Sequence, residues 1–116
     1  MTFCTAINCM DGRTQLPVNA WMRERFGAEF VDTITEPGPN GILAERADAA
    51  AVESILARVR ISVDGHGSSA VAVVGHHDCA GNPAAKDRQL AQVRDAVTVI
   101  GEQFPGVEVV GLWVDE

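Results

Sequence analysis

The pattern of apolar and polar positions predicts four strands. Residues 2–8 and 29–35 are rich in apolar, β-branched and aromatic side chains, as short strands are. Residues 70–75 form an uninterrupted apolar run, which is typical of a strand covered on both faces. Residues 107–114 form a similar segment near the end of the sequence, and we expect this to be the last strand.

Three further segments carry apolar residues at the spacing of a helix. The first begins at Pro17, a favourable first helical residue, and stops at Gly27. The second starts near Asp48 and ends near residues 64–67, and the third ends at Gly106. The apolar faces of these three predicted helices consist of Val18, Trp21, Met22 and Phe26, then Val52, Ile55, Leu56, Val59 and Val63, and finally Leu90, Val93, Val97, Ile100 and Phe104.

The order of these segments predicts an α/β fold. Residues 36–41 contain two prolines and two glycines, so we expect no regular structure there. Strands that alternate with helices through short connections favour one domain over residues 1–116, with a mostly parallel four-stranded sheet flanked by helices. In such sheets, sites form beyond the carboxyl ends of the strands.

Composition narrows the function classes. The 116 residues suffice for one core, and the net charge of -7 argues against a nucleic-acid binder, which needs clustered cations. No apolar run is long enough to cross a membrane, and the start of the sequence lacks the features of a secretion signal. We therefore expect a cytoplasmic protein, whose three cysteines are thiols or metal ligands rather than a disulfide framework.

The candidate chemistry lies where two predicted strands end. Cys9 follows the first strand, and His76 and Cys79 follow the apolar strand at residues 70–75. Neither of these cysteines has an arginine six residues later, as a phosphatase loop requires, and no C-x-x-C redox pair is present. Two thiols and one imidazole are ligands that zinc prefers, and three protein ligands leave a fourth position open, as in catalytic zinc sites.

Asp11 and Arg13 are candidate catalytic residues beside this predicted zinc site. Zn²⁺ with two thiolates and a neutral histidine carries no net charge, so it acidifies a bound water less than a cationic site would. Asp11 could accept a hydrogen bond from that water, and Arg13 could hold the carboxylate ionised. If residues 9–13 are extended, the side chains of Cys9, Asp11 and Arg13 share one face. Asp11-Gly12 is also a turn signal, so Asp11 and Arg13 could instead form an ion pair that stabilises a turn, and the two roles are compatible.

These motifs resemble those of the β-class carbonic anhydrases. The pattern C-x-D-x-R after the first strand and H-x-x-C after a later apolar strand are present as "NCMDGR" and "VVGHHDCAG", and "VVGLWVDE" is similar to the family's closing strand. The resemblance implies Zn²⁺ held by Cys9, His76 and Cys79, with a zinc-bound hydroxide that attacks carbon dioxide to give bicarbonate. It also implies that Asp11 and Arg13 act as a gate, in which Asp11 can leave Arg13 and occupy the fourth zinc position. Finally, the resemblance implies a homodimer.

The sequence also departs from that family. It begins directly at the first strand, where typical members have a helical arm that supplies a glutamine to the partner's site, and "TEPGPNG" replaces an Arg-Asn-Ala-Gly stretch. These departures leave alternatives open. The same site could hydrolyse carbonyl sulfide or carbon disulfide, or the chain could be a non-catalytic module that binds zinc or senses redox state.

Several other residues have weaker expectations. Gln15 could replace the missing glutamine or simply mark the entry to a helix, and His77 is expected in a solvent-facing loop, with a proton shuttle as the alternative. Glu36 and Asn40 could line the same crevice. The remaining assignments are His66 in a turn, Asp78 as a cap of local amides, Cys4 in the core, and Trp21 and Trp113 in the core or a subunit interface.

Overall fold

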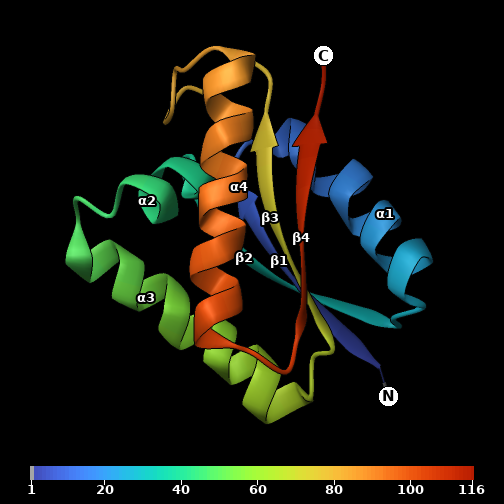
Figure 1. The fold of residues 1–116 in the computed structure, drawn as a ribbon. Helices are drawn as coiled ribbons and strands as arrows, with labels where there is room; N and C mark the ends of the chain where they lie inside the picture. Colours follow the sequence, from blue (N-terminus) through green and yellow to red (C-terminus); the bar gives the residue numbers. More distant parts are fainter. Residues whose placement is uncertain (1) are drawn as a thin grey trace.

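The computed structural model describes residues 2–116 and contains a parallel sheet with helices on both faces (Figure 1). The strand order is β2-β1-β3-β4, and every neighbouring pair is parallel. The sheet and its flanking helices confirm the predicted α/β fold. In chain order the elements are β1 (Phe3–Cys9), a 3-10 turn (Gly12–Thr14), α1 (Gln15–Phe26), β2 (Phe30–Glu36), α2 (Pro39–Glu45), α3 (Ala49–Arg60), a π-helical extension (Ile61–Gly65), β3 (Ala70–His76), α4 (Lys86–Gln103) and β4 (Glu108–Val114).

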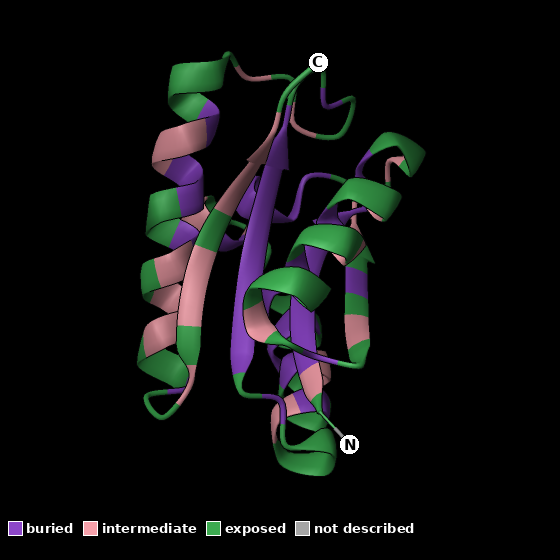
Figure 2. Ribbon diagram, turned by 90° about the vertical axis from the view of Figure 1, so that its right-hand side faces the viewer, coloured by how far each residue is buried: buried purple, intermediate pink, exposed green. Residues whose placement is uncertain are grey.

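Two apolar layers sandwich the sheet. One layer joins α3 and α4 to the sheet and includes Ile55, Val73 and Ile100, all of which are fully buried. The other joins α1 to the opposite face and includes Met22 and Val74. Since β3 is buried along its whole length, the uninterrupted apolar run in its sequence reflects cover on both faces (Figure 2).

The prediction of irregular structure at residues 36–41 is wrong in part, because α2 begins there, at Pro39. Proline has no backbone N–H, but the first residue of a helix has no intrahelical acceptor for one, and the fixed φ of proline suits that position. Gly38 precedes it with a φ of 67°, a left-handed conformation that glycine adopts without strain. The two residue types that suggested a loop therefore start a helix.

Candidate metal centre

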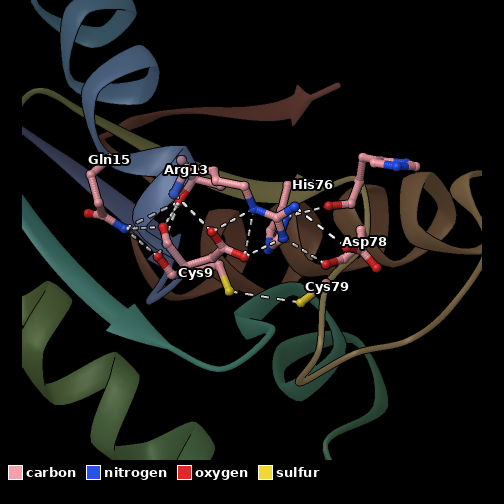
Figure 3. Close-up of polar contacts among 9 residues, drawn as sticks. Cys9, Arg13, Gln15, His76, Asp78 and Cys79 are labelled. Atoms are coloured by element: carbon pink, nitrogen blue, oxygen red, sulfur yellow. Dashed lines mark hydrogen bonds and ion pairs between the residues drawn. The ribbon is translucent and has the colours of Figure 1, made fainter. Parts of the chain in front are cut away.

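Three potential ligands meet at the carboxyl ends of two neighbouring strands. Cys9 is the last residue of β1, His76 is the last residue of β3, and Cys79 follows in the next turn. Because β1 pairs directly with β3, these strand ends lie side by side. All three residues are buried, and their ligand atoms lie within 4.8 Å of one another. The structure therefore brings together the three residues that the sequence nominated (Figure 3).

The geometry of this cluster fits a tetrahedral ion. The sulfur atoms of Cys9 and Cys79 are 3.8 Å apart. Two thiolates at about 2.3 Å from a tetrahedral zinc ion are about 3.8 Å apart, so little movement is needed to bind one. The Nδ1 atom of His76 lies 2.8 Å from the carbonyl oxygen of His77, to which an Nδ1–H would donate. That hydrogen bond would leave the lone pair of Nε2 for a metal, and Nε2 is a buried atom with no hydrogen-bond partner within residues 2–116.

The Cys79 thiol of this cluster tends to keep its proton when no metal is present. Burial raises the pKa of the Cys79 thiol, and the adjacent Cys9 raises it further, because two thiolates in a buried site repel each other. A divalent cation would offset both effects, since two thiolates balance its charge. Metal binding at this cluster is therefore coupled to proton release.

Asp11 and Arg13 form an ion pair at the exposed edge of the cluster. Nη2 of Arg13 lies 2.6 Å from Oδ2 of Asp11, and Nε lies 3.0 Å from Oδ1, so the contact is bidentate. These hydrogen bonds from Arg13 lower the pKa of Asp11 and keep its carboxylate ionised. The expected ion pair between Asp11 and Arg13 is present, and it lies at a turn.

We predicted that an extended segment would place Cys9, Asp11 and Arg13 on one face. The chain instead turns at Asp11, whose Oδ1 accepts a hydrogen bond from the backbone N–H of Arg13, and enters the 3-10 turn at Gly12–Thr14. Arg13 thus folds back onto Asp11. A cap at a helix start competes with extended structure, and Asp-Gly is a sequence that favours such turns.

Arg13 also contacts the second ligand-bearing loop. Its Nη2 donates to the carbonyl oxygen of Asp78 at 3.0 Å, and its Nη1 lies 3.5 Å from the Asp78 carboxylate. Asp78 has a φ of 56°, which is uncommon for a residue other than glycine. We expected the Asp78 side chain to cap local backbone amides, but in the structure both its carboxylate and its carbonyl oxygen contact Arg13. Arg13 therefore links the loop after Cys9 to the loop that carries Cys79.

Two glycines fix the position of the Cys79 loop against the loop that follows β2. A Cβ atom added to Gly81 would lie 2.6 Å from Cβ of Pro37, and one added to Gly38 would lie 2.5 Å from Cβ of Asn82. Nδ2 of Asn82 also donates to Oε1 of Gln92 on α4 at 2.7 Å. Our sequence reasoning missed these positioning residues. The signal available was the concentration of glycine and proline in both loops.

Gln15 does not extend toward the cluster. Its side-chain Nε2 donates to the carbonyl oxygens of Cys9 and Asp11, at 2.7 and 2.9 Å, and so braces the turn before α1. These contacts match the helix-entry interpretation and leave its amide nitrogen engaged with the backbone. His77 is about half exposed, with Nε2 at 3.9 Å from the Glu116 carboxylate, as expected for a solvent-facing residue.

A cavity of about 540 Å³ opens beside the cluster, and Arg13, His76 and His77 are among its lining residues. Glu36 and Asn40, which we expected in this crevice, are not among them. Glu36 forms an ion pair with Arg58 instead. Asn40 is buried and donates to Oε1 of Gln89 at 2.9 Å, which ties α2 to α4.

The other nominated residues lie away from the cluster. Cys4 is fully buried in the core, as predicted. His66 ends the π-helical extension rather than a simple turn, and its Nδ1 lies 2.6 Å from Oδ2 of Asp32. Trp21 and Trp113 are both partly exposed and are both among the residues that line a surface cavity between α1 and β4.

The sequence was compared with known protein families, curated proteins and solved structures. A family described as "Putative carbonic anhydrase" matches residues 1–116, which is the whole chain. No curated protein and no solved structure matches it. In residues 2–116, no helix combines the length and the apolar character that a membrane crossing requires.

Proposed function

The chain belongs to the family described as "Putative carbonic anhydrase", and from this premise we propose that it is a zinc-dependent lyase that hydrates carbon dioxide to bicarbonate. The observation that carries the proposal is the convergence of Cys9, His76 and Cys79 within 4.8 Å, beside a cavity and an ionised Asp11. Three parts of this proposal go beyond the family match: the identity of the metal, the reaction, and the roles of individual residues.

The proposed roles follow from the contacts of each side chain. Cys9, His76 and Cys79 would hold the metal, and a zinc ion bound there would lower the pKa of a coordinated water toward neutrality. The carboxylate of Asp11, whose partner Arg13 lines the cavity, would accept a hydrogen bond from a water beside the cluster and so orient it. Arg13 would keep Asp11 ionised and turned away from the metal through its bidentate contact. His77, at the rim of the cavity, would exchange protons with solvent.

The substrate class follows from the charge of the site. Two thiolates neutralise a divalent ion, and the lining of the cavity includes acidic residues at positions 78, 115 and 116 beside Arg13. A small uncharged molecule such as carbon dioxide enters such a cavity without an electrostatic penalty. Carbonyl sulfide and carbon disulfide share this property, so a hydrolase of these molecules is the second candidate. The three cysteines are free, which supports a cytoplasmic location for the proposed enzyme.

Metal analysis and carbon dioxide hydration kinetics test the proposal together. We expect one zinc per chain and measurable hydration, and Cys9→Ser should abolish both. Cys4→Ser is the matched control, because Cys4 is a buried residue of the same strand and its sulfur is 3.9 Å from a carbonyl acceptor on Phe30. Zinc content unchanged in Cys9→Ser would show that the ligand assignment is wrong.

Asp11→Asn separates catalysis from metal binding. We expect it to lower the hydration rate by about 10² to 10⁴ at unchanged zinc content, as the loss of a positioned carboxylate does. Asp95→Asn, which changes an exposed carboxylate on α4, should have no effect. Full zinc occupancy without turnover of carbon dioxide, carbonyl sulfide or carbon disulfide would exclude the enzyme and favour a zinc-binding or redox-sensing module.

A further inference from the structure

Three amide side chains are buried where α2 packs against α4. Asn40 of α2 and Gln89 and Gln92 of α4 are each at most 3% exposed. Both helices also contact β3, the strand that ends at His76 (Figure 1). Burying an amide costs free energy unless it is hydrogen-bonded, whereas an apolar side chain of the same size carries no such cost. Packing alone therefore does not explain amides at these positions.

These amides reach the loop that carries Cys79. Nδ2 of Asn40 donates to Oε1 of Gln89 at 2.9 Å, and Nε2 of Gln89 donates to the carbonyl oxygen of Asn82 at 3.0 Å. Because a carbonyl oxygen can only accept, it fixes which end of the Gln89 amide faces the loop. Oε1 of Gln92 accepts from Nδ2 of Asn82 at 2.7 Å. Helix α4 thus holds Asn82 by its backbone and by its side chain.

Asn82 in turn contacts the potential ligand Cys79. The backbone N–H of Asn82 donates to the carbonyl oxygen of Cys79 at 3.3 Å. The backbone N–H groups of Asn82 and Gly81 also contact the Cys79 sulfur. Hydrogen bonds to a ligand from its surroundings orient it toward a metal. The position of the Cys79 sulfur therefore depends on the position of Asn82.

The pair formed by Asn40 and Gln89 also lies against the strand end that carries His76. Gly75 is the residue before His76, and a Cβ atom added to it would lie 3.1 Å from Nδ2 of Asn40 and 3.3 Å from Oε1 of Gln89. Both distances are tighter than most real contacts of a Cβ atom, so the glycine allows the two amides to approach the backbone of β3 closely. One amide pair thus lies between the strand that ends at His76 and the loop that follows Cys79.

We propose that Gln89 is a positioning residue for the metal centre, because its amide sets the place of the Cys79 loop relative to the end of β3 before a metal binds. This inference rests on the proposed function, since it concerns the same metal centre. Gln89 acts through Asn82 rather than as a ligand. Apolar side chains could fill the same space, but their contacts have no direction. Two hydrogen bonds with a fixed donor and a fixed acceptor hold the loop at one distance from the strand.

A role in the fold alone would have a different consequence. If the amide pair only joined α2 to α4, its loss would lower the free energy of unfolding, and the folded chain would keep the same metal centre. If the pair positions the loop, a variant that is fully folded still binds metal less tightly. The reason is that the metal must then restrict a loop that moves freely in its absence.

Titration of the full chain with Co²⁺ tests the proposal. Tetrahedral Co²⁺ with thiolate ligands absorbs visible light, so its spectrum reports the affinity of the site and also its geometry. Gln89→Met keeps the length of the side chain and removes both hydrogen bonds. We expect the affinity for Co²⁺ to fall by about 10-fold to about 100-fold and the visible bands to change. Gln103→Met is the matched control, because Gln103 is exposed at the end of the same helix, and it should match the wild type.

A double variant separates positioning from stability. Gln89→Met alone leaves Nδ2 of Asn40 without its partner, and a buried donor without an acceptor destabilises the fold. Asn40→Leu combined with Gln89→Met replaces both partners by apolar side chains, an exchange that can be nearly neutral for stability. We expect this double variant to unfold at about the same denaturant concentration as the wild type and still to lose the affinity for Co²⁺.

Amide hydrogen exchange of the metal-free chain gives a second readout. The N–H of Asn82 should exchange faster in both Gln89 variants than in the wild type, and at the wild-type rate in Gln103→Met. An unchanged rate at Asn82, or a folded Gln89 variant with the affinity and the spectrum of the wild type, would overturn this inference alone. A wild-type chain that binds neither Co²⁺ nor Zn²⁺ would overturn the proposed function as well.

Discussion

Gly81→Ala should weaken metal binding although Gly81 contacts the Cys79 thiol only through its backbone. The added methyl group would lie 2.6 Å from Cβ of Pro37 and 2.8 Å from its backbone carbonyl carbon. Both distances are shorter than real contacts between carbon atoms, and one partner is backbone, which cannot rotate away. The loop around Gly81 must therefore shift, and Cys79 lies two residues before it.

The size of the effect follows from the cost of overpacking. Forcing a methyl group into a tightly packed contact typically costs about 1–3 kcal/mol. If the strain is relieved by moving the Cys79 loop, it appears as a loss of zinc affinity of about fivefold to about 150-fold. If the loop does not move, the same strain lowers the free energy of unfolding instead.

Zinc affinity from competition with a chelating dye, together with chemical unfolding of the metal-free chain, separates these two cases. Gly12→Ala is the matched control in the loop after Cys9, because a Cβ atom added there has no neighbour within 4 Å. We expect Gly12→Ala to match the wild type in both assays. A Gly81→Ala variant with wild-type zinc affinity and wild-type stability would refute the claim that the contact with Pro37 positions Cys79.

Three further predictions concern the charges of the site. Because burial and the adjacent Cys9 raise the pKa of the Cys79 thiol, zinc must displace the proton of Cys79 when it binds. Zinc affinity should therefore fall by at least about tenfold for each pH unit below neutrality. A zinc affinity that does not change with pH would contradict this prediction. In metal-free protein, hydrogen peroxide should oxidise Cys9 and Cys79 to a disulfide with release of two waters, and the mass of the chain should fall by two hydrogens. Bound zinc should protect the two thiols from this oxidation. A disulfide that includes Cys4 instead would contradict the prediction. Arg13 holds the pKa of Asp11 low, so the Asp11 carboxylate stays ionised as the pH falls. Arg13→Lys should raise the pKa of Asp11 and so shift the acidic limb of the pH profile of the hydration rate to higher pH. An unshifted limb would contradict the role of the Asp11–Arg13 pair.

The fold was predictable wherever burial alone sets the pattern. The apolar run of β3 and the helical spacing of α3 both follow from their place between layers of the core. The start of α2 was not predictable, because proline and glycine are common both in loops and at the start of a helix. The structure distinguishes these cases by the φ of 67° at Gly38 and by the place of Pro39 as the first helical residue. Local preference does not distinguish a loop from a helix start when both use the same residues.

The candidate site shows the same division. Cys9, His76 and Cys79 could be nominated from sequence, since the end of a parallel strand is a fixed place in such a fold. The side-chain partners could not, because they depend on side-chain reach across loops. Gln15 turned to the backbone, and the Gly81 contact with Pro37 joins loops more than forty positions apart in the sequence.

Arg13 connects these two parts of the site. One guanidinium group holds the Asp11 carboxylate and also donates to the carbonyl oxygen of Asp78, so it bridges the turn after Cys9 and the turn that contains Cys79. A residue that only kept Asp11 ionised would affect the rate but not the metal. A bridge between the two turns must affect both, because releasing it frees Cys79 to move relative to Cys9. Lysine retains the charge but cannot reach both turns at once. Loss of zinc affinity in Arg13→Lys, measured beside its shifted rate profile, would therefore distinguish a bridge from a simple counter-ion.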